Sequence, residues 1–138
     1  MNRTAIPLAA AVAAVAILHG CHVPAEESLK AQKSARRTLT LVRLKGLSAA
    51  LEGFRIHVGR YPTTEEGLAA LAQPPADPAA AAKWAGPYLN VSAGQLSDAW
   101  DRPIHYERLP GGPERYRAWS DGADGAGGTA DDVSVTGP

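Results

Sequence analysis

Apolar residues recur at steps of three and four positions in the first half of the chain. The stripe consists of Leu44, Leu47, Leu51, Phe54 and Val58. This spacing places the side chains on one face of a helix. We therefore predict a long helix over residues 28–58, with Ser28 as its N-cap and Gly59 after its last turn.

A shorter helix is predicted over residues 64–73. Thr63 and Thr64 are suitable capping residues, and acidic side chains follow in the first turn, where the helix dipole favours them. Leu68 and Leu71 give this helix an apolar face, and the prolines that follow end it.

Two strand-like segments near the C-terminus predict an antiparallel hairpin over residues 104–119. They are Ile104–Arg108 and Tyr116–Trp119, separated by Pro110-Gly111-Gly112-Pro113. Proline and glycine together favour a turn. The predicted fold is α+β, with a long helix laid against a small antiparallel sheet.

The N-terminus has the pattern of an export signal. A basic start is followed by an apolar run of about 14 residues ending at Leu18, too short to cross a bilayer. Leu18-His19-Gly20-Cys21 resembles a lipobox, which predicts a signal peptide over residues 1–20, a lipid on Cys21 and a tether over residues 21–27. The alternative is an ordinary signal peptide with an incidental cysteine.

Cys21 is the single cysteine, so an intrachain disulfide is excluded. A second acyl chain is needed for firm anchoring, and lipoprotein processing supplies one. Residue 22 is His. Resemblance to enterobacterial lipoproteins associates Asp at this position with retention in the inner membrane, so His implies the outer membrane. We expect a lipid-anchored, periplasm-facing protein of the bacterial cell envelope.

Charge is balanced overall but unevenly distributed. Lys plus Arg and Asp plus Glu both number 14, which gives no indication of nucleic-acid binding. Residues 28–45 carry only basic charges, whereas the tail from Asp121 carries only aspartates. This polarity could help subunits stack head to tail or draw the basic half toward anionic lipid. The alternative is an exposed helix face and a solvated tail.

Asp124, Asp131 and Asp132 lie in a glycine-rich segment near the C-terminus. Carboxylate oxygens are hard ligands that suit Ca²⁺, and glycines allow the backbone to turn so that separated carboxylates converge. The alternating ligands and closing Glu of an EF-hand are absent from the sequence. The alternative is a disordered acidic tail.

No catalytic pattern is evident in the sequence. His22, His57 and His105 lack the spacing of a helical metal site, and Ser120 lacks the Gly-x-Ser-x-Gly elbow of a hydrolase. We expect a protein that is not an enzyme and has no small-molecule substrate.

Four segments, in order, resemble the protein G family of type II secretion, the major pseudopilin. They are Gly59–Leu68 with its Tyr-Pro-Thr-Thr, Gly86–Leu89, Asp98–Tyr106 with its Asp-x-Trp, and Ser120–Gly125. The resemblance implies a pilin-like domain over residues 28–138 and a calcium loop over residues 120–132. It also implies Ca²⁺ ligands from Asp124, Asp131, Asp132 and the backbone carbonyl of Asp121, and partners among other pseudopilins or secretion-system proteins.

The N-terminus departs from that family. A pseudopilin carries a prepilin cleavage glycine, a glutamate five residues later and a long apolar helix, and residues 46–52 only mimic that start. The leading hypothesis is a pseudopilin-like component of a type II secretion apparatus. The alternatives are a stand-alone envelope lipoprotein that uses the same head as a binding or adaptor module and, third, an envelope hydrolase.

Overall fold

The computed structural model describes residues 24–90, 96–111 and 115–138. The predicted signal peptide over residues 1–20 and the predicted lipid site Cys21 lie outside the described residues. The described elements, in chain order, are α1 (Ala25–Val58), η1 (Gly67–Leu71), α2 (Pro78–Ala81), β1 (His105–Arg108), β2 (Tyr116–Ser120) and β3 (Val133–Thr136).

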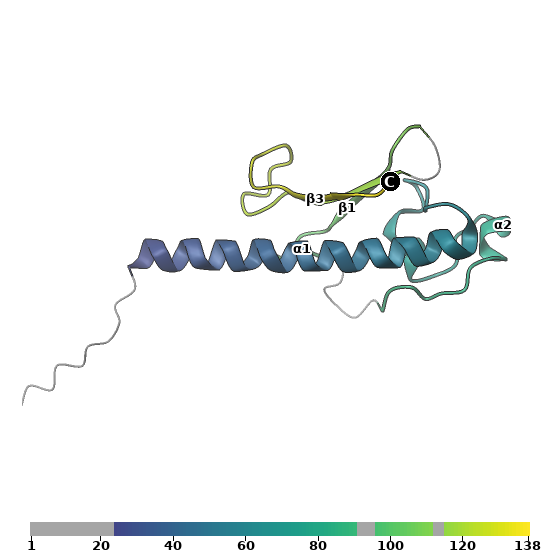
Figure 1. Ribbon diagram of the computed structural model, residues 1–138, viewed down its shortest axis with the longest axis horizontal. Helices are drawn as coiled ribbons and strands as arrows, with labels where there is room; N and C mark the ends of the chain where they lie inside the picture. Colours follow the sequence, from purple (N-terminus) through teal and green to yellow (C-terminus); the bar gives the residue numbers. More distant parts are fainter. Residues whose placement is uncertain (1–23, 91–95, 112–114) are drawn as a thin grey trace, which may run out of the picture.

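Helix α1 runs straight along the longest axis of the molecule (Figure 1). It begins at Ala25, so the tether predicted up to residue 27 is too long and the prediction of Ser28 as N-cap is wrong. Pro24 holds the N-cap position, and the acidic residues of the first turn, Glu26 and Glu27, suit the positive end of the helix dipole. The predicted end is confirmed, because Gly59 adopts a left-handed φ of 88° and its N–H donates to the carbonyl of Arg55.

The sheet has three antiparallel strands in the order β1-β2-β3. The predicted hairpin is confirmed, with His105 opposite Trp119 and Arg108 opposite Tyr116. Strand β3 adds a third strand in a segment that the sequence analysis assigned to the tail, and it pairs Ser120 with Val133. The sheet lies along one side of α1 (Figure 1).

The core lies between the second half of α1 and the sheet. The predicted stripe is confirmed, since Leu44, Leu51 and Phe54 are fully buried. Each such side chain stabilises the fold by about 1.5–3 kcal/mol through burial. The partners of the stripe in the core cluster are Tyr61, Leu68, Leu71, Ile104, Tyr116, Ala118 and Val133.

The junction after α1 is fixed by a capping box. The hydroxyl of Thr63 accepts from the N–H of Glu66, and the Glu66 carboxylate accepts from the N–H of Thr63. Arg60 donates to both carboxylate oxygens of Glu66 and thereby lowers the pKa of that carboxyl below its ordinary value. Thr63 therefore caps the turn before the helix, whereas the helix itself is a short 3₁₀ turn, η1, with Glu66 at its N-cap. The predicted α-helix over residues 64–73 is wrong.

Candidate functional site: the loop between β2 and β3

The four aspartates predicted as metal ligands all lie in the loop between β2 and β3. This loop, residues 121–132, lies over the first half of α1, beyond the end of the sheet (Figure 1). Gly122 opens the loop with a φ of 67°, and a Cβ atom there would overlap the carbonyl group of Asp131. The two ends of the loop therefore meet at a position where only glycine fits.

Asp131 organises the loop through both of its carboxylate oxygens. Its Oδ2 accepts from the N–H groups of Ala123 at 2.7 Å and Asp124 at 3.0 Å. Its Oδ1 accepts from the Thr129 hydroxyl at 2.7 Å. The Thr129 hydrogen bond, followed by those from the backbone of Asp124 and Ala123, holds the pKa of Asp131 well below its ordinary value.

The other two carboxylates of the predicted ligand set also cap backbone groups. Asp132 Oδ2 accepts from the N–H of Gly128 at 2.7 Å, and Asp124 Oδ1 accepts from the N–H of Ala126 at 2.8 Å. The Thr129 hydroxyl lies 3.2 Å from Asp132 Oδ1 as well as close to Asp131. One hydroxyl therefore lies beside carboxylate oxygens of two neighbouring aspartates.

Asp121 connects the start of the loop to the sheet. Its Oδ2 lies 2.9 Å from Nε2 of His105 on β1. The His105 ring stacks on Trp119 of β2 with the ring centroids 5.2 Å apart. The Asp121 side chain therefore contacts β1. The metal ligand that the resemblance assigns to Asp121 is its backbone carbonyl.

Carboxylate and carbonyl oxygens of this loop fit Ca²⁺ in their chemistry. Within the described ranges, however, no three His, Cys, Asp or Glu side chains are grouped closely enough to hold a metal ion. Asp124, Asp131 and Asp132 lie in one short loop, and each accepts hydrogen bonds from backbone N–H groups. A Ca²⁺ ion that uses them would have to share or displace these hydrogen bonds.

Arg102 supports the loop from the segment before β1. Its Nη1 donates to the carbonyl of Gly122 at 2.5 Å, and its Nη2 donates to the carbonyl of Ala123 at 3.2 Å. A Cβ atom at Gly125 would lie 2.7 Å from Cζ of Arg102, so the guanidinium packs directly under the loop backbone.

Asp98 anchors the segment that carries Arg102. This aspartate is fully buried, and its Oδ1 accepts from the N–H groups of Trp100 at 2.9 Å and Arg102 at 3.0 Å. Its Oδ2 accepts from the Ser120 hydroxyl at 2.5 Å. Asp98 therefore closes the turn of residues 98–102 and fixes that turn to the end of β2.

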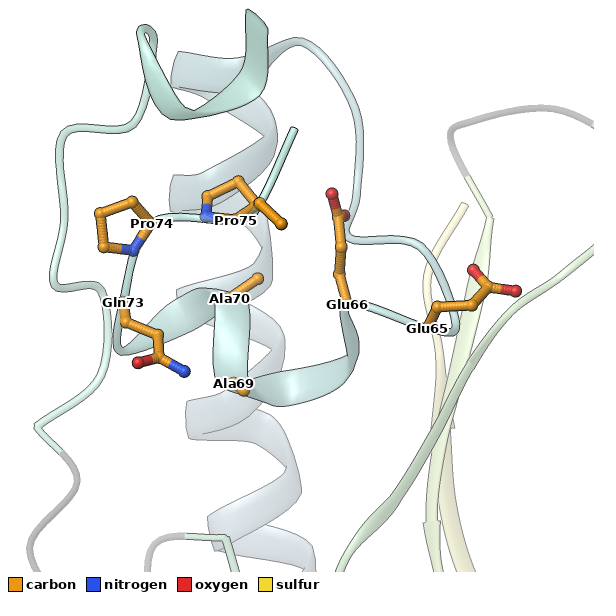
Figure 2. Close-up of a pocket in the computed structure, with 8 residues that line it drawn as sticks. Glu65, Glu66, Ala69, Ala70, Gln73, Pro74 and Pro75 are labelled. Atoms are coloured by element: carbon orange, nitrogen blue, oxygen red, sulfur yellow. The ribbon is translucent and has the colours of Figure 1, made fainter. Parts of the chain in front are cut away.

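A separate pocket lies at the opposite end of α1, beside η1. It has a volume of about 460 Å³, and its walls include Glu65, Ala69, Gln73 and Pro75 (Figure 2). Glu66, which also borders it, has its carboxylate occupied by Arg60 and the N–H of Thr63. None of the predicted ligands lies in this pocket.

Comparison with known proteins places the chain in a family. The family profile of "Type II secretion system (T2SS), protein G" matches residues 27–136. The chain belongs to the protein G family of the type II secretion system. Among solved structures, the major pseudopilin from the type 2 secretion system of enterohaemorrhagic Escherichia coli is similar, with 25% sequence identity and a TM-score of 0.60. That match covers 81% of this chain and 94% of the other. Among curated proteins, none matches.

Membership of the protein G family settles the general class of the protein. It is a pseudopilin-like component of type II secretion, and the family is a structural part of a machine in the bacterial cell envelope. The pilin-like fold expected from the sequence is confirmed by the long helix on a three-stranded sheet. Among the described helices, none combines the length and apolar character that a bilayer span requires.

The protein G motifs have clear structural roles here. Residues 60–66 form the capping junction, Asp98 holds the turn before β1, and residues 120–125 form the first part of the loop. Sequence reasoning missed Arg102, Arg37 and Lys33, which all contact the loop. For Lys33 and Arg37 the available signal was the run of exclusively basic residues over 28–45, but it did not reveal what the side chains contact. Arg102 lies outside that run.

Proposed function

We propose that this chain is a lipid-tethered, pseudopilin-like subunit that acts with other secretion-system proteins and binds Ca²⁺ in the loop of residues 121–132. The observation that carries the secretion role is the extent of the family match, over residues 27–136. The likeness to a solved pseudopilin supports it too, because the match covers 81% of this chain and 94% of the other.

The secretion role is tested by deletion and by co-purification. We expect deletion of the gene to block release of exoproteins, and the full chain to co-purify with secretion-system proteins from crosslinked envelopes. A deletion strain with normal exoprotein release would contradict the role. Restoration by the wild-type chain is the control for effects on neighbouring genes.

A second candidate is a stand-alone envelope lipoprotein that uses the pseudopilin head as an adaptor. The first half of α1 favours this candidate. Every residue from 29 to 39 is exposed and most of them are polar or charged, so this segment lacks the long apolar character expected of a pilin helix. Normal exoprotein release in the deletion strain, together with capture of envelope proteins outside the secretion machinery, would favour this candidate.

The tether is proposed from the segment Leu18-His19-Gly20-Cys21. Intact mass spectrometry of the mature protein should find residue 21 at the N-terminus with diacylglycerol on sulfur. The matched variant Cys21→Ser should lack the lipid and fractionate away from membranes. A mature chain that begins elsewhere, or an unmodified cysteine, would exclude the tether. If the lipid is found, membrane fractionation identifies which membrane holds the protein.

Ca²⁺ binding is supported by the oxygen donors of Asp124, Asp131 and Asp132 and by the family resemblance. We expect Ca²⁺ to raise the Tm and protect residues 121–132 from protease, and EDTA to reverse both effects. Asp124→Ala should remove the response, whereas Glu65→Gln, at the other end of the molecule, should retain it. The absence of any Ca²⁺ response in the wild-type chain would refute this part of the proposal, and Mg²⁺ is the control for ionic strength.

A further inference from the structure

The first half of α1 contacts the loop through two basic side chains. Nη1 of Arg37 donates to the backbone carbonyl of Asp131 at 2.9 Å, across 94 residues of sequence. Nζ of Lys33 lies 3.8 Å from Asp131 Oδ2. Because Lys33 and Arg37 are four residues apart on one helix, they present their charges on the same face.

Arg102 approaches the same loop from the segment before β1. Its guanidinium donates to the carbonyls of Gly122 and Ala123. Gly122 and Asp131 are brought together where the ends of the loop meet. Three cations from two separate parts of the chain therefore converge on the oxygen atoms at the base of one loop.

Carbonyl and carboxylate oxygens are the groups that a hard divalent cation would also use. We propose that Lys33, Arg37 and Arg102 form a basic clasp, which supplies positive charge to the loop from within the chain. The clasp holds the loop folded without a bound ion. It also fastens the first half of α1 to the head, by which we mean the second half of α1, the sheet and the loop of residues 121–132. A divalent ion at Asp131 then competes with Lys33 and Arg37, and this last consequence rests on the proposed Ca²⁺ binding.

The clasp matters for α1 because little else packs against its first half. Residues 29–39 are all exposed, and Thr40 is the first fully buried residue of the helix. The remaining contact surface is a groove lined by Leu29, Gln32, Lys33, Arg36, Trp100 and Ala123. An isolated helix of this length is marginally stable in water. Release of the clasp should therefore loosen both the loop and the start of α1.

Hydrogen exchange of the full chain in EDTA tests the clasp without any metal. The clasp variant carries Lys33→Gln and Arg37→Gln. The control variant carries Lys30→Gln and Lys45→Gln, which remove the same charge from exposed positions of the same helix. We expect exchange to rise about fivefold in residues 25–39 and 121–132 of the clasp variant, the size expected for losing one typical intramolecular hydrogen bond. Equal exchange in the two variants would overturn the clasp.

A Ca²⁺ titration of the same three proteins tests the competition. Calorimetry should show the clasp variant binding Ca²⁺ about fivefold more tightly than the wild type, with the control variant unchanged. Equal affinity in all three proteins would overturn the competition. If none binds Ca²⁺, the competition and the proposed Ca²⁺ binding both fail, and the exchange measurements in EDTA still decide whether the clasp holds the loop.

Discussion

The two halves of α1 are one continuous helix held in place by different forces. Residues 40–58 bury an apolar stripe against the sheet and η1, and the helix there is a core element. Residues 25–39 bury no side chain, and their long-range hydrogen bond and ion pair come from Arg37 and Lys33 to the loop. The comparison shows that helical geometry alone does not reveal whether apolar packing or polar contacts position a segment.

The difference has a consequence for function. A segment held by apolar packing is released only when the head unfolds, whereas one held by a few exposed polar contacts can open locally at much lower cost. In a subunit tethered near residue 21, the first half of α1 would lie between the tether and the head. Polar contacts at the loop would then control how rigidly the head is held on its tether.

The largest expected effect is on the free energy of unfolding, and it distinguishes the buried face from the exposed face of residues 40–58 of α1. Phe54→Ala removes a fully buried ring from the core and should lower the free energy of unfolding by about 3–5 kcal/mol. Ile56→Ala changes a side chain that is 68% exposed on the same helix, and its effect should stay within about 0.5 kcal/mol. Urea denaturation followed by circular dichroism measures both. Similar losses for the two variants would contradict the assignment of the buried face.

The next effect concerns the polar support of the loop. Asp98→Ala leaves the N–H groups of Trp100 and Arg102 without their acceptor and should cost about 2–3 kcal/mol. Asp101→Asn is the matched control, because Asp101 is exposed and has a φ of 61°, which asparagine tolerates. The free energy of unfolding in urea should be nearly unchanged for the control. A loss of equal size in both variants would exclude a special role for the buried carboxylate.

The sequence predicted those parts of the fold that depend on local patterns. The stripe from Leu44 to Val58 indicated the packed face, and Gly59 marked the end of α1. Strand β3 was missed because Val133–Thr136 follows a long glycine- and aspartate-rich segment, and its strand character depends on pairing with β2. The first turn of α1 was missed because Pro24 provides no side-chain cap.

The loop contacts could be predicted only in part. The aspartates were identifiable from their chemistry and from the resemblance, but their hydrogen bonds to backbone N–H groups depend on the φ angles of the folded loop. The basic clasp joins residues 94 positions apart, and no local spacing encodes such a contact. The charge pattern indicated that residues 28–45 are basic and the tail is acidic. Which of the basic side chains contact the acidic loop is determined by the fold.

A smaller effect on stability separates the contribution of Arg102, a member of the basic clasp, from the cost of straining the loop backbone. Gly125 and Gly128 both have positive φ angles, of 70° and 86°, so Gly→Ala strains the backbone at either position by about 1 kcal/mol. At Gly125 the new Cβ would also push against Arg102, whereas nothing lies within 4 Å at Gly128. Gly125→Ala should therefore cost about 1 kcal/mol more than Gly128→Ala in urea denaturation. Equal costs would indicate that Arg102 yields without losing its hydrogen bonds.

The smallest expected effect is the pH dependence of the loop. Hydrogen bonds lower the pKa of Asp131 in the folded chain, and the bond from Thr129 is the largest cause. The ionised carboxylate therefore stabilises the folded loop above about pH 4, the ordinary range of an aspartate, and this stabilisation is lost as the pH falls below that range. Thr129→Val should move the carbon-13 NMR titration of the Asp131 carboxyl to higher pH, and the loop should open at higher pH as well. Thr129→Ser keeps the hydroxyl and should titrate like the wild type. An unchanged titration in Thr129→Val would assign the lowered pKa to the backbone N–H groups of Ala123 and Asp124, and the loop would then be organised by its own turns.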